Sequence, residues 1–166
     1  MVIDPWVLNT ELTGWQESTG EDPRGERLYI SERAHIILPF HRYLDSLDKK
    51  IGTTGRGIGP TYADKTNRIG LRFGDLSEVM GDDDWMDATT ARMNSTLSAA
   101  GSEDTITVSG LKADVEWIWN AYCTSIQNTG LMLDNALKLG EHIILEGAQG
   151  CLLDIDQGTF PYVTSS

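Results

Sequence analysis

A stretch rich in glycine and basic residues lies in the first half of the chain and reads GTTGRGIGPTYADKTNRIGLR, residues 52–72. Its first eight positions contain the glycines Gly52, Gly55, Gly57 and Gly59. Glycines at this density let the backbone approach a ligand closely and present N–H groups to anionic oxygens. Thr53 and Thr54 add hydroxyl donors beside them. Because the spacing matches neither a Walker A loop nor a dinucleotide fingerprint, the stretch predicts a phosphate-binding loop of another kind, mobile without its ligand.

Basic residues follow this loop. Lys65, Arg68 and Arg72 are spaced i, i+3, i+7, which on a helix would form one basic face. The whole chain carries a net charge of −12, which argues against a nucleic-acid surface. Between residues 49 and 72, however, Asp64 is the lone acid among the basic residues. A positive region on an acidic protein indicates a small anionic ligand, with a merely solvated basic face as the alternative.

Bulk properties place the chain among ordinary globular proteins. Its 166 residues are enough for one domain with a buried core. No apolar run approaches the ~18 residues of a membrane span, and the first residues do not resemble a signal peptide. Cys123 and Cys151 give neither a disulfide framework nor a zinc spacing, so we expect a cytoplasmic protein without membrane contact.

Periodicity predicts more helix than strand, in an α/β arrangement. Helices are expected from Asp4-Pro5, from Pro39 to Leu47, from Asp82 to Ala99, along the stripe Val115 to Ile126, and from Leu131 to Leu139. Short strands are expected at 28–30 and 143–145, the second of them buried.

Several conspicuous side chains have structural explanations. The tryptophans are expected to pack in the core or an interface, and the three histidines, His35, His41 and His142, show no metal spacing. Asp82 to Asp84 suit a helix N-terminus better than a metal cluster. Asp154 and Asp156 fit an acid and base pair or local turn hydrogen bonds equally well.

Two strings together are specific for one family. GTTGRGIGPTYADK with the following Arg68 and Gly70, and LEGAQG-LLDID-GT-PYVTSS near the end, closely resemble adenylosuccinate synthetase. The resemblance implies a helix-rich central part of a P-loop-type α/β fold with few strands. It also implies the family's reaction, in which IMP and L-aspartate are joined with GTP as co-substrate and Mg²⁺ as cofactor. GTP phosphorylates O6 of IMP, and the aspartate amine then displaces that phosphate at C6.

The resemblance also assigns roles to individual residues. Thr54 and Thr164 correspond to hydroxyls on the IMP phosphate, and Gln149 to the amide beside the purine ring. Arg56 corresponds to an arginine near the aspartate and the transferred phosphoryl group, so Arg56 and Gln149 are the catalytic candidates. Arg68 corresponds to an arginine that reaches the IMP of the other subunit in a homodimer. Supporting loop positions are Gly52, Thr53, Gly55, Gly57 and Lys65.

The composition of the later helices predicts an interface as well. They carry more aromatic and methionine side chains than a short helical layer was expected to hide, namely Trp85, Met86, Met93, Trp117, Trp119 and Tyr122. We therefore expected this region to build the dimer.

Some parts of the family pattern are missing from the sequence. No G-x-x-x-x-G-K string occurs, so the GTP phosphate loop and the Mg²⁺ ligands are expected to lie outside residues 1–166, as is the part that binds guanine and aspartate. We expect residues 1–166 to be the central portion of a single domain, inactive alone. The alternatives are a related ligase acting on a 2-amino purine and a non-catalytic nucleotide-binding or interaction module.

Overall fold

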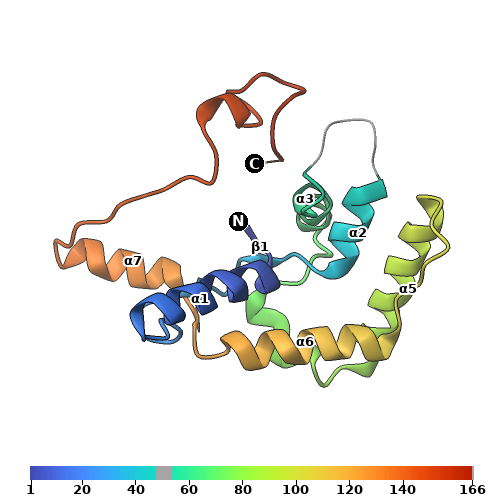
Figure 1. Ribbon diagram of the computed structural model, residues 1–166, viewed down its shortest axis with the longest axis horizontal. Helices are drawn as coiled ribbons and strands as arrows, with labels where there is room; N and C mark the ends of the chain where they lie inside the picture. The colour runs from blue at the N-terminus through green and yellow to red at the C-terminus, as the bar shows by residue number, and fades with distance from the viewer. Residues whose placement is uncertain (48–53, 166) are drawn as a thin grey trace.

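The described part of the protein is built mainly from helices and contains four two-residue strands (Figure 1). The computed structural model describes residues 1–47 and 54–165. The long helices are α1 (Pro5–Thr19), α2 (Pro39–Leu47), α3 (Ile58–Asn67), α5 (Asp83–Ala99), α6 (Val108–Tyr122) and α7 (Thr129–Lys138). Short turns of helix, η1 (Phe73–Asp75), α4 (Leu76–Val79) and η2 (Cys151–Leu153), complete the set.

The strands form two separate parallel pairs. β1 (Val2–Ile3) pairs with β3 (His35–Ile36), with Val2 opposite His35. β2 (Ile30–Ser31) pairs with β4 (Ile126–Gln127), with Ile30 opposite Ile126. Parallel pairing joins segments that are apart in sequence, so the first pair ties the start of the chain to residues 35–36, and the second ties residues 30–31 to the segment after α6.

Local capping explains where the helices begin. The Asp4 carboxylate accepts hydrogen bonds from the N–H groups of Trp6 and Val7, and Pro5 occupies the first helical position of α1. The Asp82 carboxylate likewise accepts the N–H of Trp85 at the start of α5. These caps confirm the predicted starts of both helices and the interpretation of Asp82 as a helix terminus.

One apolar core lies between α5, α6, α4 and the β1–β3 pair. The hydrophobic residues with at most 1 % exposure are Ile36, Phe73, Leu76, Met86, Met93, Leu97, Val115, Ile118 and Tyr122. The Tyr122 hydroxyl donates to the Pro5 carbonyl at 2.5 Å, which fixes α1 to α6. Trp6 stacks on Trp117 with ring centroids 5.3 Å apart.

The structure corrects one expectation about packing and one about the length of a helix. Met86, Met93 and Tyr122 are buried within the chain, so they leave nothing for a partner to cover and the compositional argument for an interface was wrong for them. Trp15, which was expected to pack in the core or an interface, lies outside this core and is 48 % exposed near the end of α1. Ile126 belongs to β4 and not to the helix of its apolar stripe, because α6 ends at Tyr122.

The predicted strand at 143–145 is absent, although α7 and the left-handed Gly140 after it agree with the predicted helix and its end. Residues 141–147 run extended without a ladder, and Ile144 and Leu145 are 93 % and 87 % exposed. A strand requires a neighbour for its N–H and C=O groups, and none of the described segments pairs with this one. The extended run carries the chain from α7 back toward α3 (Figure 1).

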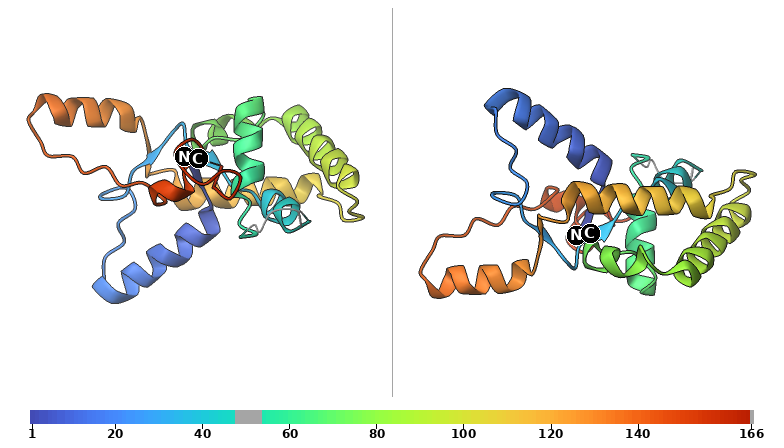
Figure 2. Two further views of the ribbon diagram at one scale, coloured as in Figure 1. Left: turned by 90° about the horizontal axis from the view of Figure 1, so that it is seen from above. Right: turned by 90° about the horizontal axis from the view of Figure 1, so that it is seen from below.

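Viewed from above and below, α1 and α7 project from one end of the molecule (Figure 2). Helices α2, α3 and α5 lie at the other end, with the last residues of the chain near α3.

Candidate functional site at helix α3

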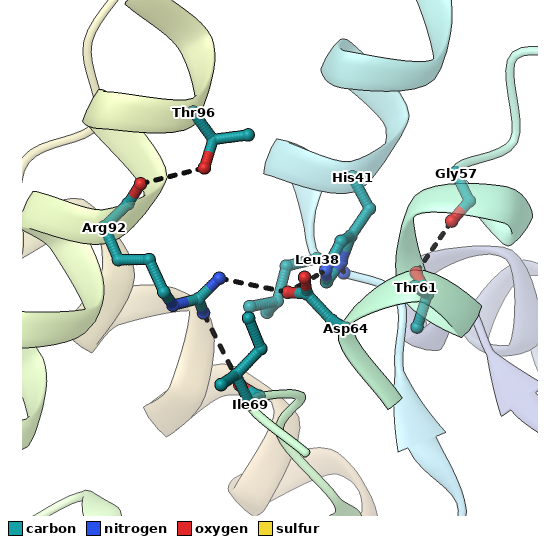
Figure 3. Close-up of polar contacts among 8 residues, drawn as sticks. All are labelled: Leu38, His41, Gly57, Thr61, Asp64, Ile69, Arg92 and Thr96. Carbon is teal, nitrogen blue, oxygen red and sulfur yellow. Dashed lines mark hydrogen bonds and ion pairs between the residues drawn. The ribbon is translucent and has the colours of Figure 1, made fainter. Parts of the chain in front are cut away.

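A tight turn of alternating glycines leads into α3. Gly55 and Gly57 have φ angles of 67° and 76°, the left-handed region that glycine enters without steric cost. The Gly57 N–H donates to a carboxylate oxygen of the buried Asp45 on α2, at 2.9 Å. The Thr61 hydroxyl in turn donates to the Gly57 carbonyl at 2.7 Å (Figure 3). This end of the predicted loop is therefore hydrogen-bonded to α2.

Gly57 also lies against the backbone of α2. A Cβ atom at Gly57 would come within 2.7 Å of the Arg42 nitrogen and 2.8 Å of the His41 carbonyl carbon. Among the described residues, no atom lies within 4 Å of a Cβ placed at Gly55. The glycine requirement therefore has two origins: conformation at both positions, and close approach at Gly57 alone.

The predicted phosphate ligands of this turn are open to solvent. Thr54 and Arg56 are both exposed on either side of Gly55. Gly52 and Thr53 lie outside the described residues. The start of α3 follows directly, and a helix N-terminus favours anions. The turn therefore combines backbone donors, a hydroxyl and a guanidinium in one short segment.

The end of the chain comes to the same place. Ser165 lies against the start of α3, where its hydroxyl would be 3.4 Å from a Cβ at Gly59. The neighbouring Thr164 is half-buried and donates its N–H to the Leu153 carbonyl at 2.8 Å. The structure thus brings the segment of Thr164 to the glycine turn, across more than a hundred residues of sequence.

Gln149 is not delivered by a strand end. It lies half-buried in a bend between the extended run and η2. Beyond η2, the Asp154 carboxylate accepts the N–H groups of Asp156 and Gln157, both at 2.9 Å. These backbone hydrogen bonds lower the pKa of Asp154. Asp154 thus organises a turn, which favours the second of the two explanations for this aspartate pair.

The predicted basic face of Lys65, Arg68 and Arg72 does not form. α3 ends at Asn67, and Arg68 caps it in the left-handed conformation with φ of 63°. Arg72 lies beyond this turn in extended backbone and forms an isolated antiparallel β-bridge with His35. Its guanidinium pairs with the Asp75 carboxylate at 2.7 Å, which raises the pKa of Arg72. The i, i+3, i+7 spacing places these three residues on one face only if the helix is continuous, and the turn at Arg68 interrupts it. Arg68 is exposed and borders a cavity of about 270 Å³ beside Trp85.

A buried polar network joins three helices behind the turn, and the sequence did not reveal it. A carboxylate oxygen of Asp64 on α3 lies 3.2 Å from the His41 Nε2 of α2 and 3.2 Å from the Arg92 Nη1 of α5 (Figure 3). His41 is 2 % exposed and Asp64 14 %. Burial raises the pKa of Asp64, but the His41 hydrogen bond and the Arg92 charge outweigh it, so the pKa lies below its usual value. The one available signal was that Asp64 is the lone acid of a basic segment.

Two features were not found among the described residues. Within 1–47 and 54–165, no group of three or more His, Cys, Asp or Glu side chains could hold a metal ion. In the same part of the chain, no helix has the length and apolar character needed to cross a membrane.

Comparisons with known proteins point to a single family. The family model for adenylosuccinate synthetase matches residues 1–166. An adenylosuccinate synthetase of Chlorobaculum tepidum is 44 % identical over 173 residues, covering 100 % of this chain and 39 % of the relative. That of Sorangium cellulosum is 41 % identical with 40 % of its length covered. The solved structure of fully ligated adenylosuccinate synthetase from Plasmodium falciparum superimposes with a TM-score of 0.78 at 30 % identity, over 100 % of this chain and 39 % of that one. The chain therefore spans about two fifths of the length of these relatives.

Proposed function

Because the chain belongs to the adenylosuccinate synthetase family, we propose that it supplies the IMP-phosphate-binding part of an enzyme that joins IMP to L-aspartate at the expense of GTP. One observation carries the proposal. The glycine turn at the start of α3, flanked by the exposed Thr54 and Arg56, lies beside the Thr164–Ser165 segment, which is distant in sequence. Hydroxyls and backbone N–H groups converging on one point form a suitable cradle for a phosphate monoester.

Each proposed ligand has a chemical role in this reaction. Thr54 and Thr164 donate hydroxyl hydrogen bonds to the IMP phosphate, and Gln149 positions the purine by its amide. Arg56 stabilises charge on the phosphoryl group that moves from GTP to O6, and the aspartate amine then displaces that phosphate at C6. Binding energy from the remote 5′-phosphate would help to hold C6 and O6 in place for both steps.

The Mg²⁺ that the family implies does not fit the residues described here. Among residues 1–47 and 54–165, no cluster of acidic, histidine or cysteine side chains is suited to a metal ion. We therefore assign no step of the reaction to a metal held by these residues. Phosphoryl transfer depends on positioned donors and countercharge, so we expect the chain alone to yield no adenylosuccinate from IMP, GTP, Mg²⁺ and aspartate. Turnover above background by the purified chain would contradict this.

The direct test is a titration of the chain with IMP and with inosine, which lacks the phosphate. IMP should shift the amide resonances of Gly55 and Gly57, and inosine should not. Thr54→Val and Thr164→Val remove one hydroxyl each and should weaken IMP binding roughly tenfold each. Thr66→Val is the matched control, since the exposed Thr66 hydroxyl bonds only within α3. Equal responses to IMP and inosine would remove the basis of the proposal.

We further propose that Arg68 contacts the IMP phosphate of a second subunit. α3 has ten residues and therefore separates the glycine turn from Arg68 by about 15 Å, at 1.5 Å per residue. An arginine at the far end of a rigid helix does not readily reach a phosphate held at the near end. In a two-fold dimer each subunit would supply this arginine to the other.

Subunit mixing tests this role in the full-length enzyme of the family. Arg68→Ala subunits are mixed with subunits disabled by Gln149→Ala. If Arg68 works in trans, a mixed dimer collects both defects in one site and leaves the other intact, so activity partly returns. No recovery, with subunit exchange verified, would place Arg68 in its own subunit's site.

A further inference from the structure

We propose that Asp64 is a positioning residue that fixes the turn carrying Arg68, and that His41 and Arg92 hold Asp64 in place for this purpose. The functional consequence rests on the proposed contact of Arg68 with a phosphate. The structural claim, that the network sets the turn, stands on the geometry of residues 64–70 alone.

The Asp64 carboxylate is held from two sides (Figure 3). The Leu38 N–H donates to the His41 Nδ1 at 2.9 Å, so this ring nitrogen is an acceptor and the proton of a neutral His41 lies on Nε2. Nε2 therefore donates to Asp64, across 3.2 Å. Arg92 Nη1 donates to the same oxygen from α5. The last turn of α3 is thereby attached to both α2 and α5.

The backbone of Asp64 organises the turn directly. Its carbonyl accepts the N–H of Ile69 at 3.0 Å and that of Gly70 at 3.2 Å. The second guanidinium nitrogen of Arg92 reaches the Ile69 carbonyl at 3.5 Å. Asp64 thus contacts the turn through its carbonyl oxygen, and Arg92, which is paired with the Asp64 carboxylate, contacts it through the Ile69 carbonyl.

Arg68 needs such support because its conformation is unfavourable. It is the one non-glycine residue with a positive φ in the described part of the chain. Side chains other than glycine, asparagine and aspartate rarely adopt this region, and it persists where the surroundings determine it. The turn is also confined on its other face, since a Cβ at Gly70 would come within 2.8 Å of the His35 ring.

The consequence is a fixed direction for an exposed guanidinium. A flexible arginine loses rotamer and backbone entropy when it binds, whereas an arginine on a locked turn has already lost the backbone part. His41 adjoins the close approach at Gly57, and Asp64 holds the far end of the same helix. The network therefore fixes the position of Arg68 relative to the glycine turn, because its contacts hold both ends of α3.

The structural test uses backbone resonances of the chain. Asp64→Asn keeps the shape of the side chain but removes its charge, and Arg92→Gln removes the fork that contacts Asp64 and Ile69. A positive φ brings the amide proton and Hα of the same residue close together, which gives a strong NOE cross-peak. In both variants this cross-peak of Arg68 should weaken. Amide exchange at Ile69 and Gly70 should accelerate roughly tenfold to a hundredfold, as for a lost charge-assisted hydrogen bond.

Two controls separate positioning from general loss of stability. Asp83→Asn breaks an ion pair with Lys112 on the surface of α5, where Asp83 is 80 % exposed, and should leave the turn unchanged. Arg92→Lys keeps a cation beside Asp64 and should restore part of the protection. Exchange at Ile118 in the core reports any global effect, and Arg92→Gln carries the test if Asp64→Asn unfolds the chain. If Asp64→Asn and Arg92→Gln match Asp83→Asn at Arg68, Ile69 and Gly70, the proposal is overturned.

A binding cycle tests the consequence separately. Asp64→Asn should weaken IMP binding when Arg68 is present and have little further effect once Arg68→Ala has been introduced, because the two changes act through one contact. Additive losses would show that Asp64 does not act through Arg68 and would overturn its positioning role. If the turn loosens but Arg68→Ala leaves IMP binding unchanged, the network still positions Arg68, and only the proposed phosphate contact fails.

Discussion

Among glycine-to-alanine substitutions in the glycine turn, Gly57→Ala should lower the free energy of unfolding the most. The substitution places a Cβ where φ is 76° and where the Arg42 nitrogen and His41 carbonyl carbon would be 2.7 Å and 2.8 Å away. Both of these atoms belong to the backbone of α2, so they cannot rotate aside as a flexible side chain would. Relief requires α2 and α3 to separate, which would also stretch the hydrogen bond from Gly57 to Asp45.

The magnitude is the sum of two separable costs. A left-handed conformation costs an alanine about 1–2 kcal/mol relative to glycine. Forcing a methyl into a filled contact adds typically 1–3 kcal/mol. We therefore expect Gly57→Ala to lower the free energy of unfolding by about 2–5 kcal/mol. Gly55→Ala is the matched control, because its φ is 67° and its Cβ would meet nothing within 4 Å, which leaves only the conformational cost.

Urea unfolding of the parent and the two variants gives the comparison. With a slope of about 1–3 kcal/mol per molar urea, the two variants should differ in midpoint clearly while sharing the same slope. The difference between them isolates the close approach to α2. If Gly57→Ala and Gly55→Ala fall within about 0.5 kcal/mol of each other, α2 gives way easily and the rigidity that we assign to the turn is wrong.

Substitutions at three further residues test other contacts of the structure. Asp45→Ala removes the buried acceptor of the Gly57 N–H and should cost about 1–3 kcal/mol in urea unfolding, whereas Asp45→Asn keeps an acceptor oxygen and should cost less. Tyr122→Phe leaves the Pro5 carbonyl without its donor and should lower stability by about 1–3 kcal/mol at neutral pH. Because the folded-state pKa of Asp64 lies below its usual 3.8, its contribution is present above that value and is lost as the pH falls through the lower one. Asp64→Asn should therefore flatten the decline in stability in this acid range, and an unchanged slope would contradict the assignment.

The parts of the fold that the sequence predicted are those fixed by neighbouring residues. Asp4 before Pro5, and Asp82 before the apolar stripe of α5, satisfy N–H groups only two or three residues away. The glycine turn is local in the same sense, since φ angles near 70° at Gly55 and Gly57 are a property of those positions. The position of Thr164 near that turn had a different source, because only the family resemblance associated these two distant segments.

The failed predictions concern contacts made by remote residues. The apolar run at 143–145 has the composition of a buried strand, yet strand formation depends on a partner ladder that composition does not encode. The spacing of Lys65, Arg68 and Arg72 is helical, but α3 stops because Asp64 and its remote partner Arg92 hold the next residues in a turn. Met86 and Met93 were interpreted as interface residues because the sequence does not show that a separate helix, α6, covers this side of α5 and buries them in the core.

Asp64 shows how a charge count can conceal a structural role. Counted along the sequence, it merely reduces the positive charge of residues 49–72. A carboxylate only 14 % exposed is costly to bury unless it is paired, so its position inside α3 requires cationic or hydrogen-bonding partners close by. Those partners are not the basic residues beside it in sequence but His41 and Arg92, on two other helices. Arg68, which lies in the turn after α3, does not pair with the Asp64 carboxylate, because His41 and Arg92 already do. Its side chain therefore stays exposed and available to a ligand.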